Sequence, residues 1–449
     1  MSGLIINGAA IVTMDGDRHE YAHGHISVDG NRIVSVGQGV VSAAPGATVI
    51  DAAGCLATPG FVNTHHHLYQ WLTRGLATDA TLFEWLTTLY PMWARIDAEV
   101  VNTAGAAALA RLARTGCTTT TDHQYVVPRG GGDVFAAEIA AAQAVGLRFH
   151  PCRGSMDLGK SAGGLPPDEI VEDRDTILAA TEAAIDEWHD ASFDSMLRIA
   201  VAPCSPFSVT GELMADAAQL ARRKGVRLHT HLAETDDEDD YCREHFGASP
   251  LDYVESLGWS GPDVWYAHGV HFDDDAVKRI GASGTGIAHC PTSNARLGAG
   301  IARAVDLRAA GAAVGLGVDG AASNESSSLL EEVRHALLFA RARGGPAAMS
   351  AREALELATR GGAAVLGRAD EIGSLEVGKL ADVALWRMDT PTHADIEDPV
   401  SALVLGTPPP LELLLVDGRV VVERGVVHTV DEDALAAQVV RAHGKLVTA

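Results

Sequence analysis

Short apolar segments alternate with longer, alanine-rich amphipathic segments through the middle of the chain. The apolar segments have the length and flanking turns of buried strands, and the segments between them have the length and periodicity of helices. Regular alternation of strand and helix predicts a parallel α/β fold, and eight such strands match a (β/α)8 TIM-type barrel. We expect the strands at Phe61–His65, Cys117–His123, Leu147–Arg153, Leu197–Ala202, Val226–His231, Val264–His268, Gly286–His289 and Val314–Asp319.

The two ends of the chain have a different pattern, in which short alternating strands are separated by tight turns. Near the N-terminus, Arg32–Val36 follows the hairpin signal Asp29-Gly30-Asn31, and near the C-terminus Leu413–Val416 leads into the turn Asp417-Gly418. Together the two ends predict one small β-sandwich domain, formed by both termini around an inserted barrel. The expected division is residues 1–58 for the first part of the β-sandwich, 59–369 for the barrel and 370–449 for the second part.

Polar side chains gather where the predicted barrel strands end. His65 and His67 are two residues apart in an extended segment, so their imidazoles share one face and can reach one metal ion, while His66 faces elsewhere. The later strands end in His231, with Glu234 shortly after it, in His268 and in Asp319. A barrel brings the carboxyl ends of its strands to one face, where its catalytic groups lie. The sequence therefore predicts a single site built from these strand ends.

Length and composition fit one large barrel with a smaller domain and exclude several other classes. The chain has 449 residues and a formal net charge of −25, which argues against a nucleic-acid groove because phosphates attract Lys and Arg. No apolar stretch has the length needed to cross a bilayer, and because the first residues lack a charged segment followed by a long apolar core, we expect an unexported protein. The 6 cysteines are scattered without paired spacing, as expected for reduced thiols. We expect a cytoplasmic protein whose partner is a small molecule, with neither nucleic acid nor membrane as a partner.

Two other features have simpler explanations. The segment His19-Glu20-Tyr21-Ala22-His23 matches the HExxH zinc pattern, which binds metal only on a helix, and the residues around it leave too little chain for one. We interpret it as a turn in the β-domain. The acidic run at residues 236–240 precedes a helical stretch and is interpreted as a solvated helix start.

Several segments resemble motifs of the amidohydrolase superfamily, in its branch of aminohydrolases that act on purines, pterins and triazines. The resemblance covers nearly the whole chain, and the motifs together are far more specific than any one of them. It rests on residues 59–67 (PGFVNTHHH), 231–235 (HLAET), 267–271 (AHGVH), 289–294 (HCPTSN), 317–320 (GVDG) and, where the barrel returns to the β-domain, 372–382 (IGSLEVGKLAD).

The resemblance implies hydrolytic deamination of an amino-substituted heteroaromatic ring, a reaction of hydrolases that act on C–N bonds of cyclic amidines. The segments at residues 65–74, 152–164, 202–209 and 294–301 resemble members that act on 8-oxoguanine, which would be attacked at C2 to give urate and ammonia. The alternatives are a deaminase of isoxanthopterin or another pterin, and a hydrolase that removes chloride or an amine from a triazine. A metal-free assembly protein of this family would lack the ligands that are present here. A homo-oligomer is expected from the resemblance alone.

By position, His65, His67, His231 and Asp319 form a ligand set of three nitrogens and one carboxylate. One divalent ion suits this set, Zn²⁺ before Fe²⁺, and it would lower the pKa of a bound water so that hydroxide can attack the ring carbon. Glu234 would take the proton and deliver it to the ring nitrogen and the leaving amine. His268 and Asp319 would orient the water and stabilise the developing charge.

A flat ring beside the metal requires hydrogen-bonding groups and aromatic walls. The loops that follow the strands supply an amide, a cation and several aromatic side chains for this purpose. For His289 and Asn294, at and after the end of the seventh strand, the sequence leaves open whether the side chain contacts substrate or has a structural role. The expected substrate residues are Gln70, Arg153, Trp85, Trp93, Tyr125, Phe207, His289 and Asn294.

Overall fold

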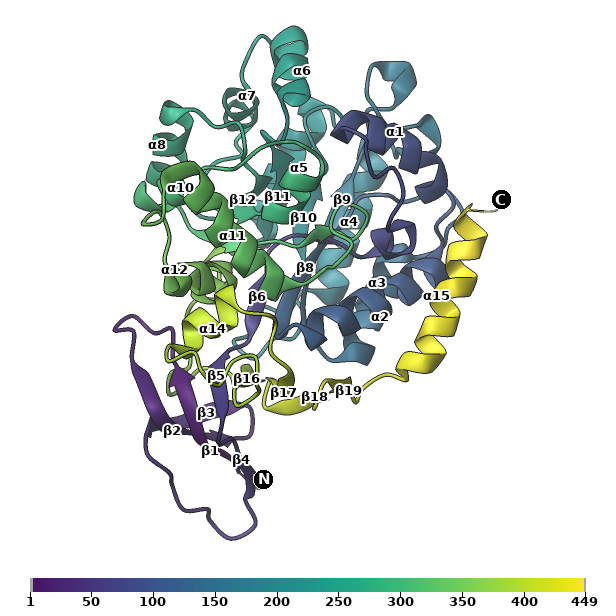
Figure 1. Cartoon of the computed structure of the whole chain (residues 1–449). Helices are drawn as coiled ribbons and strands as arrows, with labels where there is room; N and C mark the ends of the chain where they lie inside the picture. The colour runs from purple at the N-terminus through teal and green to yellow at the C-terminus, as the bar shows by residue number, and fades with distance from the viewer. Residues whose placement is uncertain (1–2, 448–449) are drawn as a thin grey trace.

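A closed barrel of parallel strands lies at the centre of the structure, a computed structural model that describes residues 3–447 (Figure 1). Its strands neighbour one another in the order β10-β11-β12-β13-β14-β6-β8-β9, and every pairing in the ring is parallel. The predicted barrel is confirmed, with one observed strand for each predicted one. These strands are β6 (Phe61–Asn63), β8 (Cys117–Gln124), β9 (Arg148–Ser155), β10 (Ala200–Pro203), β11 (Arg227–Leu232), β12 (Val264–His268), β13 (Gly286–His289) and β14 (Val314–Leu316).

The first and last barrel strands end earlier than the sequence predicts, because the chain leaves the barrel wall at the site. Beyond β6 and β14, the segments β7 (His66–His67) and β15 (Asp319–Gly320) form a separate parallel ladder in which Asp319 pairs with His66. Asp319, the first residue of β15, has a φ of 61°, a left-handed conformation that sets this short ladder apart from the barrel wall. This ladder holds the ends of the first and eighth strands side by side.

Helices cover the outside of the barrel and most of them link successive strands (Figure 1). Local signals fix their ends, as in α5, where the side chain of Thr210 accepts the N–H of Leu213 and Gly225, with a φ of 70°, ends the helix. Within residues 3–447, no helix is both long and apolar enough to span a membrane. The helices are α1 (Leu82–Trp93), α2 (Ala98–Arg114), α3 (Val134–Val145), α4 (Arg174–Trp188), α5 (Gly211–Lys224), α6 (Asp236–Phe246), α7 (Pro250–Ser256), α8 (Asp274–Ser283), α9 (Pro291–Arg296), α10 (Ala304–Ala309), α11 (Leu329–Gly344), α12 (Ala351–Glu356), α13 (Gly362–Val365), α14 (Pro399–Leu405) and α15 (Glu432–Val447), with a short 3₁₀ helix η1 (Leu68–Thr73) after β7.

Both ends of the chain contribute to a second, mixed sheet at the lower end of the molecule in Figure 1. Its strands follow the order β19-β18-β17-β16-β5-β1-β2-β3, with β4 also paired to β1. Apolar side chains from both halves, among them Ile6, Ile26, Val383 and Leu413, form a core separate from that of the barrel. The small β-domain built from both termini is thus confirmed. Its strands are β1 (Leu4–Val12), β2 (Glu20–Asp29), β3 (Arg32–Gln38), β4 (Thr48–Asp51), β5 (Cys55–Pro59), β16 (Val383–Arg387), β17 (Leu411–Val416), β18 (Arg419–Glu423) and β19 (Val426–Val427).

The HExxH segment lies at the start of β2 and is extended, so its two histidines are not arranged as they would be on a helix. Nδ1 of His19 instead lies 2.6 Å from a carboxylate oxygen of Asp15. The segment belongs to the β-domain, although as part of a strand and not of a turn.

A buried ion cluster joins the barrel to the β-domain. The guanidinium of Arg148 on β9 lies 3.2 Å from Asp382 and 3.5 Å from Asp417, and the side chain of Arg148 is fully buried. Helix α15, at the C-terminal end, leaves the β-domain and packs against α2 and η1 of the barrel (Figure 1). We propose domain boundaries near residues 58 and 370, with α15 as a C-terminal segment that returns to the barrel surface.

Candidate active site

Strand ends bring three imidazoles and a carboxylate together at the mouth of the barrel. Nε2 of His65 and Nε2 of His67 each lie 3.3 Å from Oδ1 of Asp319. Nε2 of His67 also lies 3.1 Å from Nε2 of His231, which β11 contributes. All four residues are buried, with at most 9% of their surface exposed. The structure therefore places the residues predicted as metal ligands around one point.

Backbone carbonyls determine the tautomer of two of these imidazoles. Nδ1 of His67 lies 2.9 Å from the carbonyl of His123, and Nδ1 of His231 lies 2.7 Å from the carbonyl of Cys204. A carbonyl oxygen only accepts, so each Nδ1 donates its proton. Burial lowers the pKa of both imidazoles, so both are neutral and each Nε2 keeps its lone pair. Two lone pairs thus face each other across 3.1 Å, an arrangement that a cation stabilises.

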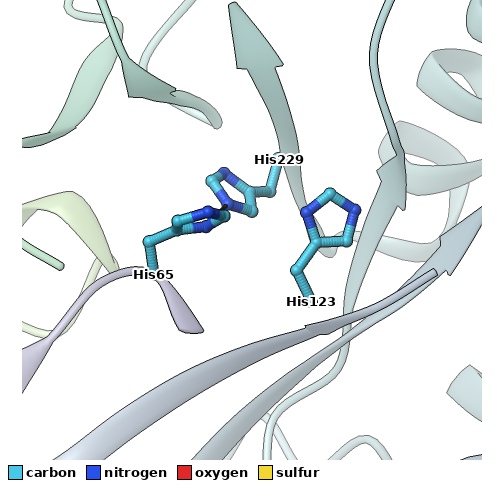
Figure 2. Close-up of side chains that lie close together, drawn as sticks. All are labelled: His65, His123 and His229. Atoms are coloured by element: carbon cyan, nitrogen blue, oxygen red, sulfur yellow. Dashed lines mark hydrogen bonds between the residues drawn. The ribbon is translucent and has the colours of Figure 1, made fainter. Parts of the chain in front are cut away.

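A second histidine holds His65 in the same tautomer (Figure 2). Nδ1 of His229 donates to the carbonyl of Trp265 at 3.0 Å, which leaves Nε2 of His229 as an acceptor 2.8 Å from Nδ1 of His65. His65 therefore donates through Nδ1, and its Nε2 is buried without a hydrogen-bond partner. His123 lies beside this pair in Figure 2, and the three histidines form a second cluster of possible metal ligands. Because Nε2 of His123 is bound to a backbone carbonyl, few nitrogen atoms of this cluster are free to bind a metal. His229 is a hydrogen-bonded core residue, and it also orients His65.

Three separations within the ligand set match those of a tetrahedral divalent-ion site. Zn²⁺ binds imidazole nitrogen and carboxylate oxygen at about 2.0–2.2 Å, so neighbouring ligand atoms of a tetrahedral site are about 3.3 Å apart. The separations of 3.3 Å from Asp319 to His65 and to His67, and of 3.1 Å between His67 and His231, agree with this spacing. Nitrogen and oxygen donors of this kind also match the chemical preference of zinc. The described residues therefore fit a divalent metal.

Asp319 is fixed in position by donors to its second oxygen. Oδ2 accepts a hydrogen bond from the hydroxyl of Ser293 at 2.5 Å and from that of Ser323 at 3.2 Å. Burial acts to raise the pKa of Asp319, but its contact with His65 and its proximity to His268 and His67 hold that pKa well below its usual range. Asp319 is therefore a carboxylate throughout the neutral pH range.

Glu234 and His268 lie beside the ligand set, and Oε2 of Glu234 is 3.5 Å from Nε2 of His268. Burial raises the pKa of Glu234 to about 7, and the charge of His268 opposes this shift. Burial lowers the pKa of His268, but the charges of Glu234 and Asp319 outweigh that effect, so the net shift is upward. Nδ1 of His268 also bonds to Oδ1 of Asn294 at 2.9 Å. A carboxylate with a pKa near neutrality is well suited to accept and return a proton.

Glu238 holds the turn that carries Glu234. Its two carboxylate oxygens accept the backbone N–H groups of Ala233 at 2.9 Å and of Glu234 at 3.0 Å, and its side chain is fully buried. Ala233 has a φ of 53°, so the turn is in a conformation that such a clamp stabilises. The interpretation of residues 236–240 as a solvated helix start is wrong for Glu238. Thr235 followed by Glu238 has the spacing of a capping box, a signal that marks Glu238 as the inward member of the run.

A narrow pocket opens beside these groups, and half of the predicted substrate residues line it. Gln70 is the polar member, and neither its amide oxygen nor its amide nitrogen has a hydrogen-bond partner among residues 3–447. The free volume is about 30 Å³, which is the space of about one water molecule. The lining side chains therefore leave no room for a bicyclic ring in this conformation. The predicted residues in the lining are Gln70, Trp85, Tyr125 and Phe207. The lining also contains residues that no sequence pattern indicated, namely Leu82, Leu86, Tyr90, Cys204, Ser205 and Leu297.

The other four predicted substrate residues are placed elsewhere. Both oxygens of Glu172 accept from Nη2 of Arg153, at 2.9 and 3.0 Å, which fixes this guanidinium outside the pocket lining. Trp93 lies behind Trp85, with ring centroids 5.1 Å apart. Asn294 contacts His268 and not the pocket. His289 lines a separate cavity, because it follows the inward-facing Ala288 on β13 and so points out of the barrel.

Several known proteins are similar to this chain in both sequence and fold. Residues 56–421 match the model of the amidohydrolase family. The chain is 45% identical to 8-oxoguanine deaminase of Pseudomonas aeruginosa, with 97% of this chain and 96% of the relative covered, and 36% identical to isoxanthopterin deaminase of an unknown prokaryotic organism, with 97% and 95% covered. It matches the crystal structure of atrazine chlorohydrolase TrzN from Arthrobacter aurescens TC1 complexed with zinc, with a TM-score of 0.94, 33% identity and coverage of 98% and 100%. The chain therefore belongs to the amidohydrolase family and is a hydrolase that acts on C–N bonds of cyclic amidines.

Proposed function

We propose that this protein deaminates 8-oxoguanine to urate and ammonia with one bound divalent metal ion, Zn²⁺ before Fe²⁺. The observation that carries the hydrolytic chemistry is the set of free Nε2 lone pairs around Asp319, with Glu234 beside it. The choice of ring is supported by the relative from Pseudomonas aeruginosa, which is 45% identical over nearly the whole chain. His65, His67, His231 and Asp319 would hold the metal.

Each residue of the site has a distinct part in this reaction. A divalent metal supplies Lewis acidity, which makes hydroxide available near neutral pH. Glu234 takes one proton of the attacking water and passes it to the ring nitrogen, and then carries the remaining hydroxyl proton to the leaving amine, a task that matches its pKa of about 7. His268, held by Asn294, directs Nε2–H toward the same region and stabilises negative charge as the ring carbon becomes tetrahedral.

The pocket lining suits a flat, polar ring. The side chains of Trp85, Tyr125 and Phe207 provide aromatic surface, and the unpartnered amide of Gln70 offers one donor and one acceptor to the edge of a lactam. A buried amide without a partner is costly, and a substrate with a complementary edge removes that cost. We therefore assign ring recognition to Gln70 and ring stacking to the aromatic walls.

A second candidate is deamination of a pterin or hydrolysis of a triazine. The chain is 36% identical to an isoxanthopterin deaminase, and its fold superimposes on a zinc-containing triazine hydrolase with a TM-score of 0.94. The same ligand set and proton carrier would serve these rings, so the difference between substrates lies in the pocket lining and not in the metal site.

Release of ammonia from a panel of rings tests the proposal. Zinc-loaded protein is incubated with 8-oxoguanine, guanine, isoxanthopterin and aminotriazines, while ammonia and urate are measured; chloride release is followed for chlorotriazines. We expect the highest kcat/KM for 8-oxoguanine, with urate and ammonia formed in equal amounts, and no reaction by Glu234→Gln. Turnover of another ring without urate formation from 8-oxoguanine would support the second candidate and contradict the first.

A further inference from the structure

A second cavity, of about 390 Å³, lies between η1, α2 and α15 on the outside of the barrel. Its lining shares no residue with the active-site pocket. Three arginines, Arg74, Arg111 and Arg114, line it together with Trp71, and the half-exposed Glu432 is its one acidic lining residue. The rest of the lining is apolar and comes from α2 and α15.

Two of these arginines have no carboxylate partner within ion-pair distance in residues 3–447. Arg74 stacks on Trp71, with its guanidinium carbon 3.4 Å from the ring centroid, and its Nε donates to the carbonyl of Trp71. Nε of Arg111 donates to the carbonyl of Ser326 at 2.9 Å. These contacts use one N–H of each guanidinium and leave the terminal N–H groups without a hydrogen-bond partner among residues 3–447. Arg114 is different, because it lies 3.1 Å from Glu432.

The two guanidiniums also repel each other. Burial lowers the pKa of Arg74, and the charge of Arg111 lowers it further. The carboxylates nearest to them are already engaged, because Glu325 lies 2.9 Å from Arg296 and Glu331 accepts from the hydroxyl of Ser326. Acidic residues outnumber basic ones by 59 to 34 in this chain, so unpaired, half-buried arginines side by side are unusual here. An anion between them would relieve the repulsion and satisfy the free N–H groups.

We propose that this cavity binds a small oxyanion, phosphate or carboxylate, between Arg74 and Arg111. The cavity has room for an oxyanion that carries an organic group, and the apolar face of α15 would contact that group. Planar guanidiniums match the geometry of both kinds of oxyanion, which is why arginine commonly recognises them. Glu432 at the margin, paired with Arg114, does not compete for the inner two arginines.

The position of this cavity links its occupant to the active site. Arg74 directly follows η1, which carries Gln70 into the active-site pocket, and Arg111 holds the loop after β15 through Ser326. An anion bound to both arginines would tie these two segments together from outside the barrel. Occupancy is therefore expected to lower KM for the ring substrate without contributing a group to the reaction.

Calorimetric titration of the zinc-loaded full chain with inorganic phosphate tests the site, with sodium chloride at matched ionic strength as the baseline. Acetate and a nucleoside monophosphate are titrated in parallel, to separate carboxylate, free phosphate and an organic phosphate as ligands. We expect saturable binding of at least one of them. Arg74→Met and Arg111→Met should each weaken it by about tenfold or more, because each removes a charge-assisted contact. Arg441→Met, an exposed arginine on α15 outside the cavity lining, is the matched control and should bind as the wild type does.

The variants also distinguish anion binding in this cavity from anion binding at the active-site metal. Binding that is equally strong in Arg74→Met, Arg111→Met and the wild type arises at the metal or from general screening, and it would overturn the proposal. Absence of saturable binding for all three anions would overturn it as well. Because Arg111 does not stack on Trp71, Arg111→Met keeps the test decisive if Arg74→Met fails to fold.

Discussion

At the scale of single residues, the position of one proton on each imidazole determines what the site can bind. His67 and His231 donate through Nδ1 to backbone carbonyls, and His65 donates through Nδ1 to His229, so all three Nε2 atoms keep a lone pair. His229 in turn is fixed by a carbonyl of β12. Neutral imidazoles with a fixed tautomer are the form in which histidine binds a metal, and the partners of Nδ1 commonly tune that binding.

Glu234→Gln should abolish turnover and leave metal content unchanged. Glutamine fills the same space but accepts no proton, so we expect kcat to fall by about two to four orders of magnitude. Elemental analysis and single-turnover kinetics on the same preparation check both parts. Wild-type rates in this variant would show that another group carries the proton.

The pH dependence of kcat/KM should show an acid limb that belongs to Glu234. The protonated acid is inactive, so activity is lost as pH falls through the raised pKa of about 7. The charge of His268 lowers the pKa of Glu234, so His268→Asn should move this limb to higher pH. A limb that stays in place or moves to lower pH in His268→Asn would contradict the assignment.

At the scale of elements, the start of α6 positions the catalytic turn. Thr235 and the acidic residues after it begin the helix, and Glu238 alone among them turns inward to hold the backbone of Ala233 and Glu234. The carboxylate of Glu238 also raises the pKa of Glu234 by charge. One helical turn thus fixes both the place and the proton affinity of Glu234.

Glu238→Gln should lower kcat by about tenfold or more, while metal content and overall fold persist. An amide can accept only one of the two backbone N–H groups, and its own N–H groups face the other donor, so the turn loses its clamp. Asp237→Asn is the matched control, because Asp237 is exposed in the same helical turn and should be neutral. Equal kcat in both variants would show that Glu238 does not position Glu234.

The strand ends were predictable from the sequence because their pattern is local, and the pocket lining was not. Period-two alternation placed His65 and His67 on one face, and the barrel count placed His231 and Asp319 near them. The same alternation, counted from Ala288, would have turned His289 outward, as the structure shows. Arg153 offered a cation at the correct strand end, but its partner Glu172 lies in a loop whose path has no sequence signal.

At the scale of the whole molecule, the β-domain and barrel are joined by buried charge. Arg148 connects Asp382 and Asp417 and also donates to the carbonyl of Ser195 at 2.8 Å. At Asp382 the chain returns to the β-domain, and the motif at residues 372–382 indicates this return. The carboxylate partners of Arg148 lie more than 200 residues away along the chain, so no local pattern indicates them.

Arg148→Met should destabilise the fold by about 3 kcal/mol or more, because it leaves the buried carboxylate of Asp382 without its cationic partner. Denaturant unfolding measures the loss, and kcat per folded molecule should be unchanged because Arg148 is remote from the pocket lining. Arg114→Met is the control: its ion pair with Glu432 is about half exposed and should contribute little. Similar stability of both variants would contradict a structural role for the buried cluster.

The most direct test of the account is the metal content of the purified protein, measured by elemental analysis after loading with Zn²⁺ and removal of unbound ions. We predict about one ion per chain in the wild type. His67→Ala and His231→Ala should lose most of it, and His289→Ala, which alters a histidine outside the site, should retain it. Wild-type protein that holds no ion, or full metal content in both His67→Ala and His231→Ala, would contradict the central claim that these strand ends form one metal site.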